Sequence, residues 1–333
     1  MDAAFDLKLV SFLSASETRS GETIASELGC SRTAVWKHIE ALRELGISID
    51  AVAGKGYKLV EPLELFDREL ILSQIGEKAK NSLNKLVILA TTESSNSWLQ
   101  EQPLSEQAGV FVLAERQTAG RGRRGKKWVS PFGRNIYASL GWEFERGAGD
   151  LGCLPLLVAL SACDALDELG LRGHTIKWPN DILMNGYKLG GCLVELQGDV
   201  NGPCLAVMGI GINVQMPESA PGASAIGQAW TDVCSHVPGV SRNRLAGLLL
   251  DSLVSRIEIF SRDGFLPFHQ DWKSRDALNG KEVELLLPGS RLKGVALGIS
   301  DRGGLMLQTE QGVGEYLAGE VSVIKKESGI DEH

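Results

Sequence analysis

The first forty-five residues carry the pattern that most restricts the fold, because three short helices follow one another with little chain between them. Apolar spacing predicts helices over residues 7–14, 21–28 and 31–45. A Gly29-Cys30 turn separates the last two, and Ser31 is placed to cap the third. This spacing is typical of a helix-turn-helix.

The segment after the third helix extends this prediction. The run SIDAVAGKGYKLVEP sets Gly54-Lys55-Gly56 between two β-prone stretches, as in a hairpin whose turn carries a lysine. Pro62 is a reasonable end to the unit. The N-terminal region is therefore predicted to be a winged helix.

The third helix has two different faces. Val35, Ile39, Leu42 and Leu45 recur at helical spacing and are expected to face a small core. The candidate DNA-contacting residues are Ser31, Arg32, Thr33, Trp36, Lys37 and Arg43 on this helix and Lys55 in the wing. Trp36 could contact a thymine methyl or pack against the wing. A helix-turn-helix kept only as a structural remnant is the alternative to a DNA-binding unit.

Composition limits where such a chain can act. A length of 333 residues favours two or three domains, and a net charge of -8 requires any DNA contact to come from a local basic surface. No stretch reaches the roughly 18 apolar residues of a membrane span, and the start lacks a signal peptide, so a cytoplasmic protein without membrane contact is predicted. The six cysteines form no C-x-x-C pair and the histidines no H-E-x-x-H, which argues against zinc.

From about residue 64 the chain reads as longer strands and helices. The run NIYASLGWEF, residues 135–144, alternates apolar and smaller residues and predicts an antiparallel sheet with one covered face. Residues 152–170 and 242–262 are expected to be helical, and Asn185-Gly186 predicts a two-residue hairpin turn. Locally paired strands with separate helices indicate an α+β domain.

After Asp276 short β-prone runs are punctuated by glycines, which predicts a small barrel of about 50 residues. The predicted domains are thus 1–63, 64–275 and 276–333.

A glycine-rich basic segment, Gly120 to Trp128, follows a predicted strand. Glycines allow the backbone to approach an anion, and the interleaved cations could neutralise several negative charges, which suggests a polyphosphate ligand. Those cations are Arg121, Arg123, Arg124, Lys126 and Lys127. The alternative is a flexible basic loop that touches nucleic acid or nothing. It is not a Walker loop, because G-x-x-x-x-G-K-[ST] is absent.

A second motif, KWPNDI, precedes the hairpin and is followed by KLGGCLVE. Asn180 and Asp181 could hold a metal or orient a nucleophile, and Lys188 across the turn could meet a carboxylate or phosphate there. The alternative is an ordinary turn beside a solvated edge-strand lysine.

Taken in order, GRGRRGKKW, KWPNDI, KLGGCLVE and GIGINV resemble the bacterial biotin–protein ligases, specifically the bifunctional members with a repressor domain. The resemblance covers nearly the whole chain. It implies a class II synthetase-like mixed sheet with helices in the centre and an SH3-like β-barrel at the C-terminus.

The resemblance also implies the chemistry. Biotin and ATP with Mg²⁺ would give biotinyl-5′-AMP, and biotin would pass to a lysine of the biotin carboxyl carrier protein of acetyl-CoA carboxylase. The adenylate would act as corepressor, driving a homodimer onto operator DNA of biotin biosynthesis genes. A lipoate–protein ligase, or a regulator with an inactive catalytic domain, are the competing interpretations.

Residue roles follow from the same resemblance. The implied biotin-binding set is Ser94, Ser95, Asn96, Gln117, Arg121, Gly122, Arg123, Lys188 and Gly191. The implied ATP and adenylate set is Arg123, Arg124, Trp128, Asn180 and Asn213. Arg121, Arg123, Asp181 and Lys188 are the implied catalytic residues, with Asp181 as a candidate Mg²⁺ ligand.

Two points about these assignments stay open. Ser95 stands where many members have threonine, and Ser94-Ser95-Asn96 could also be a helix N-cap, since both roles can hold at once. The basic loop is expected to close over the reactive adenylate and exclude water. Residues 217–227, rich in small residues, are expected to form a second ordering loop.

Overall fold

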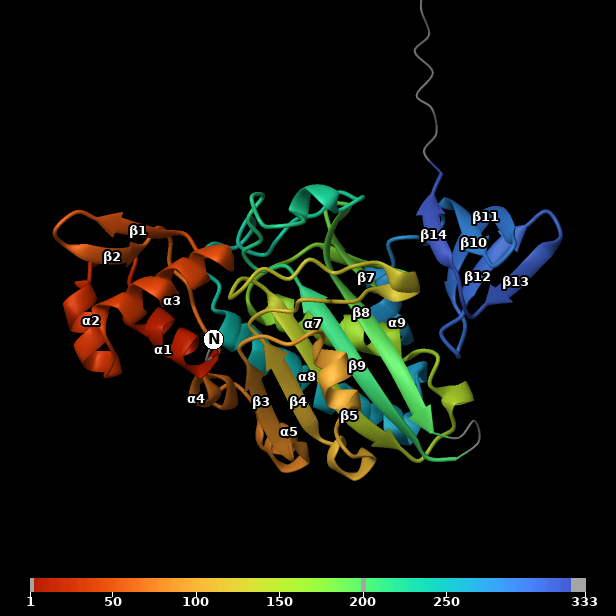
Figure 1. Cartoon of the computed structure of the whole chain (residues 1–333). Helices are drawn as coiled ribbons and strands as arrows, with labels where there is room; N and C mark the ends of the chain where they lie inside the picture. The colour runs from red at the N-terminus through yellow and green to blue at the C-terminus, as the bar shows by residue number, and fades with distance from the viewer. Residues whose placement is uncertain (1–2, 199–201, 325–333) are drawn as a thin grey trace, which may run out of the picture.

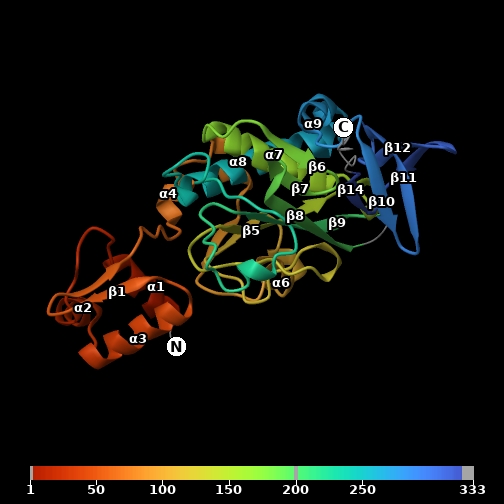
Figure 2. The ribbon, with the colours of Figure 1, turned by 90° about the horizontal axis from the view of Figure 1, so that it is seen from above.

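The computed structural model describes residues 3–198 and 202–324. The ends of the first and third predicted domains, residues 1–2 and 325–333, lie outside these residues. Two views at right angles show an N-terminal helical unit and a C-terminal β unit at opposite ends of a larger central unit (Figures 1 and 2).

The N-terminal unit has the predicted winged-helix order. Its elements are α1 (Ala3–Phe12), α2 (Gly21–Leu28), α3 (Arg32–Glu44), β1 (Ile49–Val52) and β2 (Gly56–Leu59). The Ser31 hydroxyl accepts a hydrogen bond from the Ala34 backbone N–H at 3.2 Å, so the predicted cap is confirmed. Gly29 ends α2 with a φ of 65°, where glycine has no steric penalty. The first helix begins at Ala3, earlier than predicted.

The two faces of α3 are as expected except at one residue. Val35, Ile39 and Leu42 are fully buried in the winged-helix core. Arg43 is only partly exposed, at 33% of its side chain, because its Nε and Nη2 donate to the Ile49 carbonyl oxygen at 3.0 and 2.7 Å. This side chain ties α3 to the first wing strand, so it is less open to a partner than the other predicted cations of the helix.

The central unit is built on a seven-stranded sheet of order β3-β4-β5-β9-β8-β7-β6. Its strands are β3 (Lys85–Leu89), β4 (Val110–Ala114), β5 (Ile136–Phe144), β6 (His174–Lys177), β7 (Asp181–Met184), β8 (Tyr187–Gly198) and β9 (Cys204–Ile212). The β3 and β4 strands run parallel and the other neighbours run antiparallel, so the sheet is mixed.

The Asn185-Gly186 hairpin is confirmed. These residues have φ values of 52° and 81° and join β7 to β8 with Met184 opposite Tyr187. Positive φ at both positions is the geometry that tight hairpins require. The turn sets Lys188 of β8 opposite Leu183 of β7. Leu183 follows Asp181 by two residues, so Lys188 lies close to Asp181 across the hairpin.

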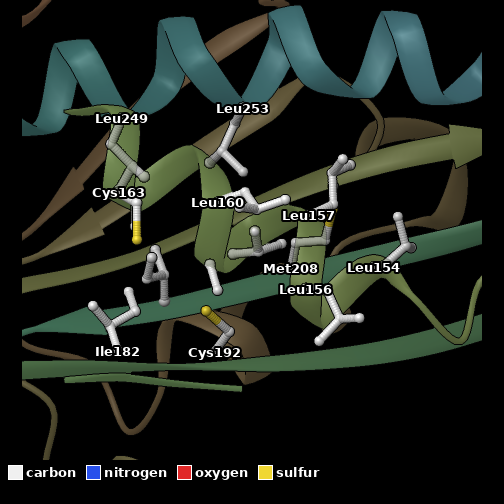
Figure 3. Close-up of a cluster of buried hydrophobic side chains, with 14 of the residues drawn as sticks. Leu154, Leu156, Leu157, Leu160, Cys163, Ile182, Cys192, Met208, Leu249 and Leu253 are labelled. Atoms are coloured by element: carbon white, nitrogen blue, oxygen red, sulfur yellow. The ribbon is translucent and has the colours of Figure 1, made fainter. Parts of the chain in front are cut away.

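Helices cover one face of the sheet in two layers. Figure 3 shows α7 (Leu154–Glu168) lying between the strands and α8 (Arg242–Asp263). Because α7 is enclosed on both sides, its sequence LPLLVALSACDAL is apolar almost all round. The remaining helices are α4 (Arg68–Leu72), α5 (Glu77–Ser82), α6 (Ser95–Gln100) and α9 (His269–Arg275). No helix of the described ranges has the length and apolarity needed to cross a membrane.

The sheet differs from the prediction of one covered face. On β5, Tyr137 is 1% exposed and Ser139 is 0% exposed, although both lie on the face opposite the α7 core. The Ser139 hydroxyl lies 2.6 Å from Asn96 Oδ1, so it is satisfied by the first turn of α6 rather than by water. The prediction was wrong because small and polar residues here face buried protein groups.

The C-terminal unit is a five-stranded antiparallel sheet of order β13-β12-β11-β10-β14. Its strands are β10 (Glu282–Leu287), β11 (Ser290–Ile299), β12 (Leu305–Thr309), β13 (Gly312–Tyr316) and β14 (Glu320–Val323). A small β unit after Asp276 is therefore confirmed. It is joined to the central unit by Trp178, which is 1% exposed and whose Nε1 donates to the Gly303 carbonyl at 2.9 Å.

One segment of the central unit is embedded in the winged helix. Phe132, 3% exposed, belongs to the winged-helix core. Gly133 has a φ of 68° and lies against Leu63, where a Cβ would come within 2.8 Å of a leucine methyl. The buried Arg134 guanidinium pairs with Glu61. The chain between the two units is therefore held on both sides.

Phe132→Ala should loosen this joint. We expect a loss of about 3–5 kcal/mol in the free energy of unfolding of the winged helix, because a buried ring is replaced by a cavity. Denaturant unfolding followed by a probe in the N-terminal unit measures it. The control is Trp36→Ala, an exposed aromatic in the same unit, which should change stability by no more than about 0.5 kcal/mol. Equal effects of the two changes would refute a role for Phe132 in that core.

Candidate functional site

A cavity of about 700 Å³ lies where the basic segment, the first turn of α6, the KWPND turn and strands β8 and β9 meet. The C-terminal unit contributes Gly319–Val321 to its wall. The predicted site residues that line it are Ser94, Ser95, Asn96, Gln117, Arg121, Gly122, Arg123, Arg124, Trp128, Asn180, Asp181, Lys188 and Gly191. Segments far apart in the sequence therefore meet in one cavity.

The start of α6 forms a buried polar wall. Ser94, Ser95 and Asn96 are each less than 5% exposed. The Ser95 backbone N–H donates to Gln117 Oε1 at 2.9 Å, and its hydroxyl lies 3.2 Å from the same oxygen. Ser94 occupies the N-cap position without a side-chain cap bond. The segment therefore does begin a helix, as the N-cap interpretation requires, but without a capping hydrogen bond from the Ser94 side chain.

Asn96 has its amide orientation fixed by its neighbours. Its Nδ2 donates to the Leu193 carbonyl at 3.2 Å and to Glu195 Oε2 at 2.8 Å. Its Oδ1 lies 2.6 Å from the Ser139 hydroxyl. Because both amide hydrogens are used by the protein, the acceptor Oδ1 is the group left to interact with a ligand. Gly209 makes room for it, since a Cβ there would approach Oδ1 to 2.3 Å.

Arg121 attaches the beginning of the basic segment to this wall. Its Nη2 donates to Ser97 Oγ and to Glu195 Oε2, both at 3.1 Å. The side chain is 44% exposed and the Glu195 side chain 26% exposed. One carboxylate oxygen therefore serves both Asn96 and Arg121.

The tip of the basic segment is held by the C-terminal unit. Arg124 and Gly125 have φ values of 54° and 73°, which turns the chain sharply. Lys126 is hydrogen-bonded to Glu320, and Arg124 Nη1 lies 3.9 Å from the same carboxylate. The hydrogen bond from Lys126 lowers the pKa of Glu320. Burial, with the neighbouring Arg124 charge, lowers the pKa of Arg123.

Three charged side chains meet beside the hairpin. Lys188 Nζ lies 2.6 Å from Asp181 Oδ1, and Lys177 Nζ lies 3.6 Å from Asp181 Oδ2. Lys188 is only 16% exposed, and β8 is an interior strand of the sheet. The interpretation of Lys188 as a solvated edge-strand lysine is therefore wrong.

The same contacts bear on the suggested metal ligand. The Asp181 carboxylate is already shared by two ammonium groups, which leaves it poorly suited to a divalent cation. In residues 3–198 and 202–324 no three acidic, histidine or cysteine side chains gather in a way that could hold a metal ion. The residues present do not fit a protein-built Mg²⁺ site at Asp181.

Trp128 lines the cavity with its ring on a strand glycine. A Cβ at Gly211 would come within 2.5 Å of the indole, so only glycine allows this contact. Within the described chain the Trp128 Nε1 is buried and has no hydrogen-bond partner. Lys188 Nζ lies 5.5 Å from the ring centroid. A buried N–H left unpaired is costly, so a polar ligand that accepts from it would fit here.

The two asparagines of the adenylate set occupy different places. Asn180 lines the cavity, and its Nδ2 donates to the Cys192 carbonyl at 2.8 Å, which fastens the KWPND turn to β8. Asn213 does not line the cavity. It is 6% exposed, and its amide donates to the Thr231 carbonyl at 3.0 Å. It therefore supports the wall from behind.

The predicted second loop lies against the cavity. Gly222, Ala225, Ile226 and Gly227 line the cavity. Ala223 and Ile226 pack in a small apolar cluster with Val129, next to Trp128. The loop and the basic segment thus meet on one side of the cavity.

Several residues of the site escaped the sequence analysis. They are Glu195, Ser139, Ser97, Lys177, Gly209, Gly211 and Glu320. The glycine alternation in GIGIN was a usable signal, because glycine inside a strand often marks a close approach of another group. Glu195 and Glu320 carried no local signal, since their partners lie far away in the sequence.

The candidate DNA face is exposed at the other end of the molecule. Ser31, Arg32, Thr33 and Lys37 are exposed on α3, and Lys55 is exposed at the wing turn. Trp36 is 52% exposed, so about half of its side chain is open to a partner. These side chains are available to a partner, whereas Arg43 is used internally.

Comparison with protein families gives three consecutive matches. Residues 6–58 match an HTH domain, residues 88–213 the biotin/lipoate A/B protein ligase family, and residues 279–323 the biotin protein ligase C terminal domain. The matches follow the three structural units in order.

Individual relatives cover most of the chain. The bifunctional ligase/repressor BirA of Escherichia coli K12 is 34% identical over 97% of this chain and 98% of its own. BirA of Bacillus subtilis 168 is 32% identical over 91% and 93%. A biotin protein ligase from Aquifex aeolicus, solved in complex with biotin and ATP, is 29% identical with a TM-score of 0.62 over 73% of this chain and 100% of its own.

Proposed function

This chain belongs to the bacterial bifunctional biotin–protein ligases, and from that premise we propose which of its residues carry each step. It is an AMP-forming biotin–[acetyl-CoA-carboxylase] ligase that also represses transcription through a helix-turn-helix domain. The assignment of roles rests on one observation. A neutral polar wall and a group of cations lie in the same cavity, one suited to a urea-like ring and the other to a carboxylate and phosphates.

The biotin ring is assigned to the neutral wall. Ser94, Ser95 and Gln117 supply hydroxyl and amide groups, and Asn96 Oδ1 accepts a ring N–H. Gly122 and Gly191 keep side chains out of the cavity. The ring is thus fixed at the buried end, with its valeryl carboxylate toward the cations.

The cations carry the first step. The biotin carboxylate attacks the α-phosphorus of ATP, pyrophosphate leaves, and the two anions repel as they approach. We assign Lys188 to the carboxylate and Arg121 and Arg123 to the carboxylate and phosphoryl oxygens. Arg124, Asn180 and Trp128 lie where the nucleotide would bind, with the unpaired Trp128 N–H as a donor to it. Asn213 supports this wall through Thr231.

The second step uses the same centre. The amine of a lysine on the biotin carboxyl carrier protein of acetyl-CoA carboxylase attacks the acyl carbon of biotinyl-5′-AMP, and AMP leaves. Asp181 is placed to accept or orient the amine proton once Lys188 has turned toward the acyl group. Mg²⁺ would accompany ATP through the phosphate oxygens and offset their charge, since Asp181 is not arranged as its ligand.

The repressor role is assigned to the exposed face of α3 and the wing. Ser31, Arg32, Thr33, Trp36, Lys37 and Lys55 are the residues we place against operator DNA of biotin biosynthesis genes. A single recognition helix has a small footprint, so we propose that biotinyl-5′-AMP acts as corepressor by promoting a homodimer. Both ATP and DNA are found in the cytoplasm, where we place the protein.

We propose domain limits of 1–63, 64–275 and 276–333. The wing ends at Leu59, shortly before the first limit, and the strands of the C-terminal sheet begin at Glu282. Each range contains one of the three family matches.

The assignments are tested together by incubating the protein with ATP, labelled biotin and a carrier domain. Label on the carrier lysine is expected, with AMP and pyrophosphate as the other products. Label on lipoyl domains from labelled lipoate, without biotin transfer, would contradict the ring assignment.

Lys188→Gln should separate the two steps. We expect biotinyl-5′-AMP formation to fall by about 100-fold or more, because a positive charge that offsets the developing anion is lost. Transfer from adenylate supplied to the enzyme should fall much less. Pyrophosphate release and carrier labelling measure the two steps, with Lys78→Gln on the exposed part of α5 as the control. Equal losses in both steps would contradict the assignment.

Gly209→Ala should damage the ring subsite alone. The new Cβ would lie 2.3 Å from Asn96 Oδ1, and such overpacking typically costs 1–3 kcal/mol, or about 5- to 150-fold in biotin Kd. Isothermal titration with biotin measures the change. Gly149→Ala, where a Cβ meets nothing within 4 Å, is the matched control. Unchanged biotin affinity in Gly209→Ala would remove Asn96 from the ring subsite.

Lys37→Ala should weaken operator binding in a salt-dependent way. If Lys37 contacts one phosphate, the slope of log K against log salt should fall by about 0.9, because one fewer counterion is released. Lys85→Ala, an exposed lysine on β3, is the control. Filter binding over a range of salt concentrations gives both slopes, and identical slopes would exclude a phosphate contact by Lys37.

A further inference from the structure

Glu195 stands between the two ends of the cavity without lining it. It lies on β8 opposite Val207 of β9, on the part of β8 that pairs with β9 and extends beyond its pairing with β7. Its Oε2 accepts from Asn96 Nδ2 at 2.8 Å and from Arg121 Nη2 at 3.1 Å. Glu195 is not among the residues found to form the cavity wall, so its effects reach a ligand through these two neighbours.

The contact with Asn96 decides what the ring subsite offers. An amide presents a donor on one side and an acceptor on the other. Glu195 and the Leu193 carbonyl, both acceptors, attract the Nδ2 side. The Oδ1 side is therefore turned to Ser139, whose hydroxyl donates to it, and its second lone pair is the acceptor left for a ring N–H.

The contact with Arg121 decides where the basic segment begins. Arg121 is bonded to Ser97 Oγ and to Glu195, so the segment is fastened to α6 and β8 together. Arg123 follows two residues later, so this anchor fixes the start of the segment, whereas Glu320 holds its tip. A hydrogen bond between ionised partners is stronger and more directional than a neutral one.

We propose that Glu195 is a positioning residue for the ligase reaction, which orients Asn96 for the biotin ring and anchors Arg121 so that the basic segment closes over the adenylate. The proposal rests on the roles given above to Asn96 and Arg121. One Glu195 oxygen accepts from both Asn96 and Arg121. The orientation of the Asn96 amide and the attachment of the basic segment therefore stabilise each other.

Glu195→Gln removes the charge of the shared acceptor. A glutamine Oε1 in the place of Oε2 can still accept from Asn96 and Arg121, but its bond to the Arg121 guanidinium is no longer between two ionised groups and is therefore weaker. We expect the Kd for biotin to stay within about twofold and dissociation of biotinyl-5′-AMP to be about fivefold faster. The KM for ATP should rise while the rate of transfer from saturating adenylate is unchanged.

Glu195→Ala removes both contacts. The Kd for biotin should then also rise, by about tenfold, because Asn96 loses the partner that holds its amide. Glu143→Gln, an exposed carboxylate on β5 of the same sheet, is the matched control and should leave all these values unchanged. Thermal unfolding of each variant checks that it is folded.

A double-mutant comparison tests the Arg121 link directly. If Glu195 acts on the segment through Arg121, Arg121→Gln with Glu195→Gln should release the adenylate no faster than Arg121→Gln alone. Additive effects, or equal losses of biotin and adenylate affinity in Glu195→Gln, would overturn the inference. If Asn96→Ala and Arg121→Gln leave biotin and adenylate binding intact, the proposed function itself fails, whatever Glu195 does.

Discussion

The structure depends on holding many positive charges around one cavity before any anionic ligand is bound. Arginines and lysines gathered at one cavity repel one another. Carboxylates from separate strands offset this repulsion by pairing with them. Glu195 of β8 pairs with Arg121, Asp181 of β7 with Lys188 and Lys177, and Glu320 of β14 with Lys126 and Arg124. All of these residues except Glu195 line the cavity, and Arg123 lines it as well. The carboxylate and phosphates of the ligands therefore meet cations that are already in position. On binding, these ligand anions take the place of the protein carboxylates as partners of the cations.

The fold supplies the rigid positions for these pairs. Strands β8 and β9 are long, paired along their length and backed by α7, so Glu195, Gly209 and Gly211 have little freedom. The KWPND turn is fixed from the other side, because Trp178 is bonded to Gly303 and Asn180 to Cys192. The C-terminal unit thus does more than cap the molecule. It fixes the turn that carries Asp181 and supplies Glu320 to the basic segment, which is why the cavity is complete only with all of the chain from α6 to β14 in place.

Local rules of sequence predicted most elements and the main motifs, because these depend on neighbours along the chain. Ser31 as a cap, Asn185-Gly186 as a hairpin and the inward face of α3 needed only spacing and residue type. What depended on distant partners was missed. Arg43 looked like an outward cation until β1 supplied the Ile49 carbonyl, and Ser139 looked solvent-facing until α6 covered it. Asn213 belongs to the GIGINV motif, yet its side-chain amide donates to the Thr231 carbonyl. Nothing in the motif predicts this contact. Glu195 and Glu320 gained meaning only when remote cations were placed beside them.

The same reasoning explains why ligase and repressor functions can share one chain without a flexible joint. The segment that begins at Trp128 on the cavity wall ends, a few residues later, with Phe132 in the winged-helix core and Arg134 paired to Glu61. On the other side of the joint, the fully buried Glu115 accepts from Phe66 N–H at 2.5 Å and from Arg242 at 2.9 Å, so the incoming chain is bound to the central unit before α4 begins. A buried ion pair of this kind is costly to break, because either partner alone would be left as an uncompensated charge. Buried contacts between the two units therefore fix the orientation of the recognition helix relative to the cavity.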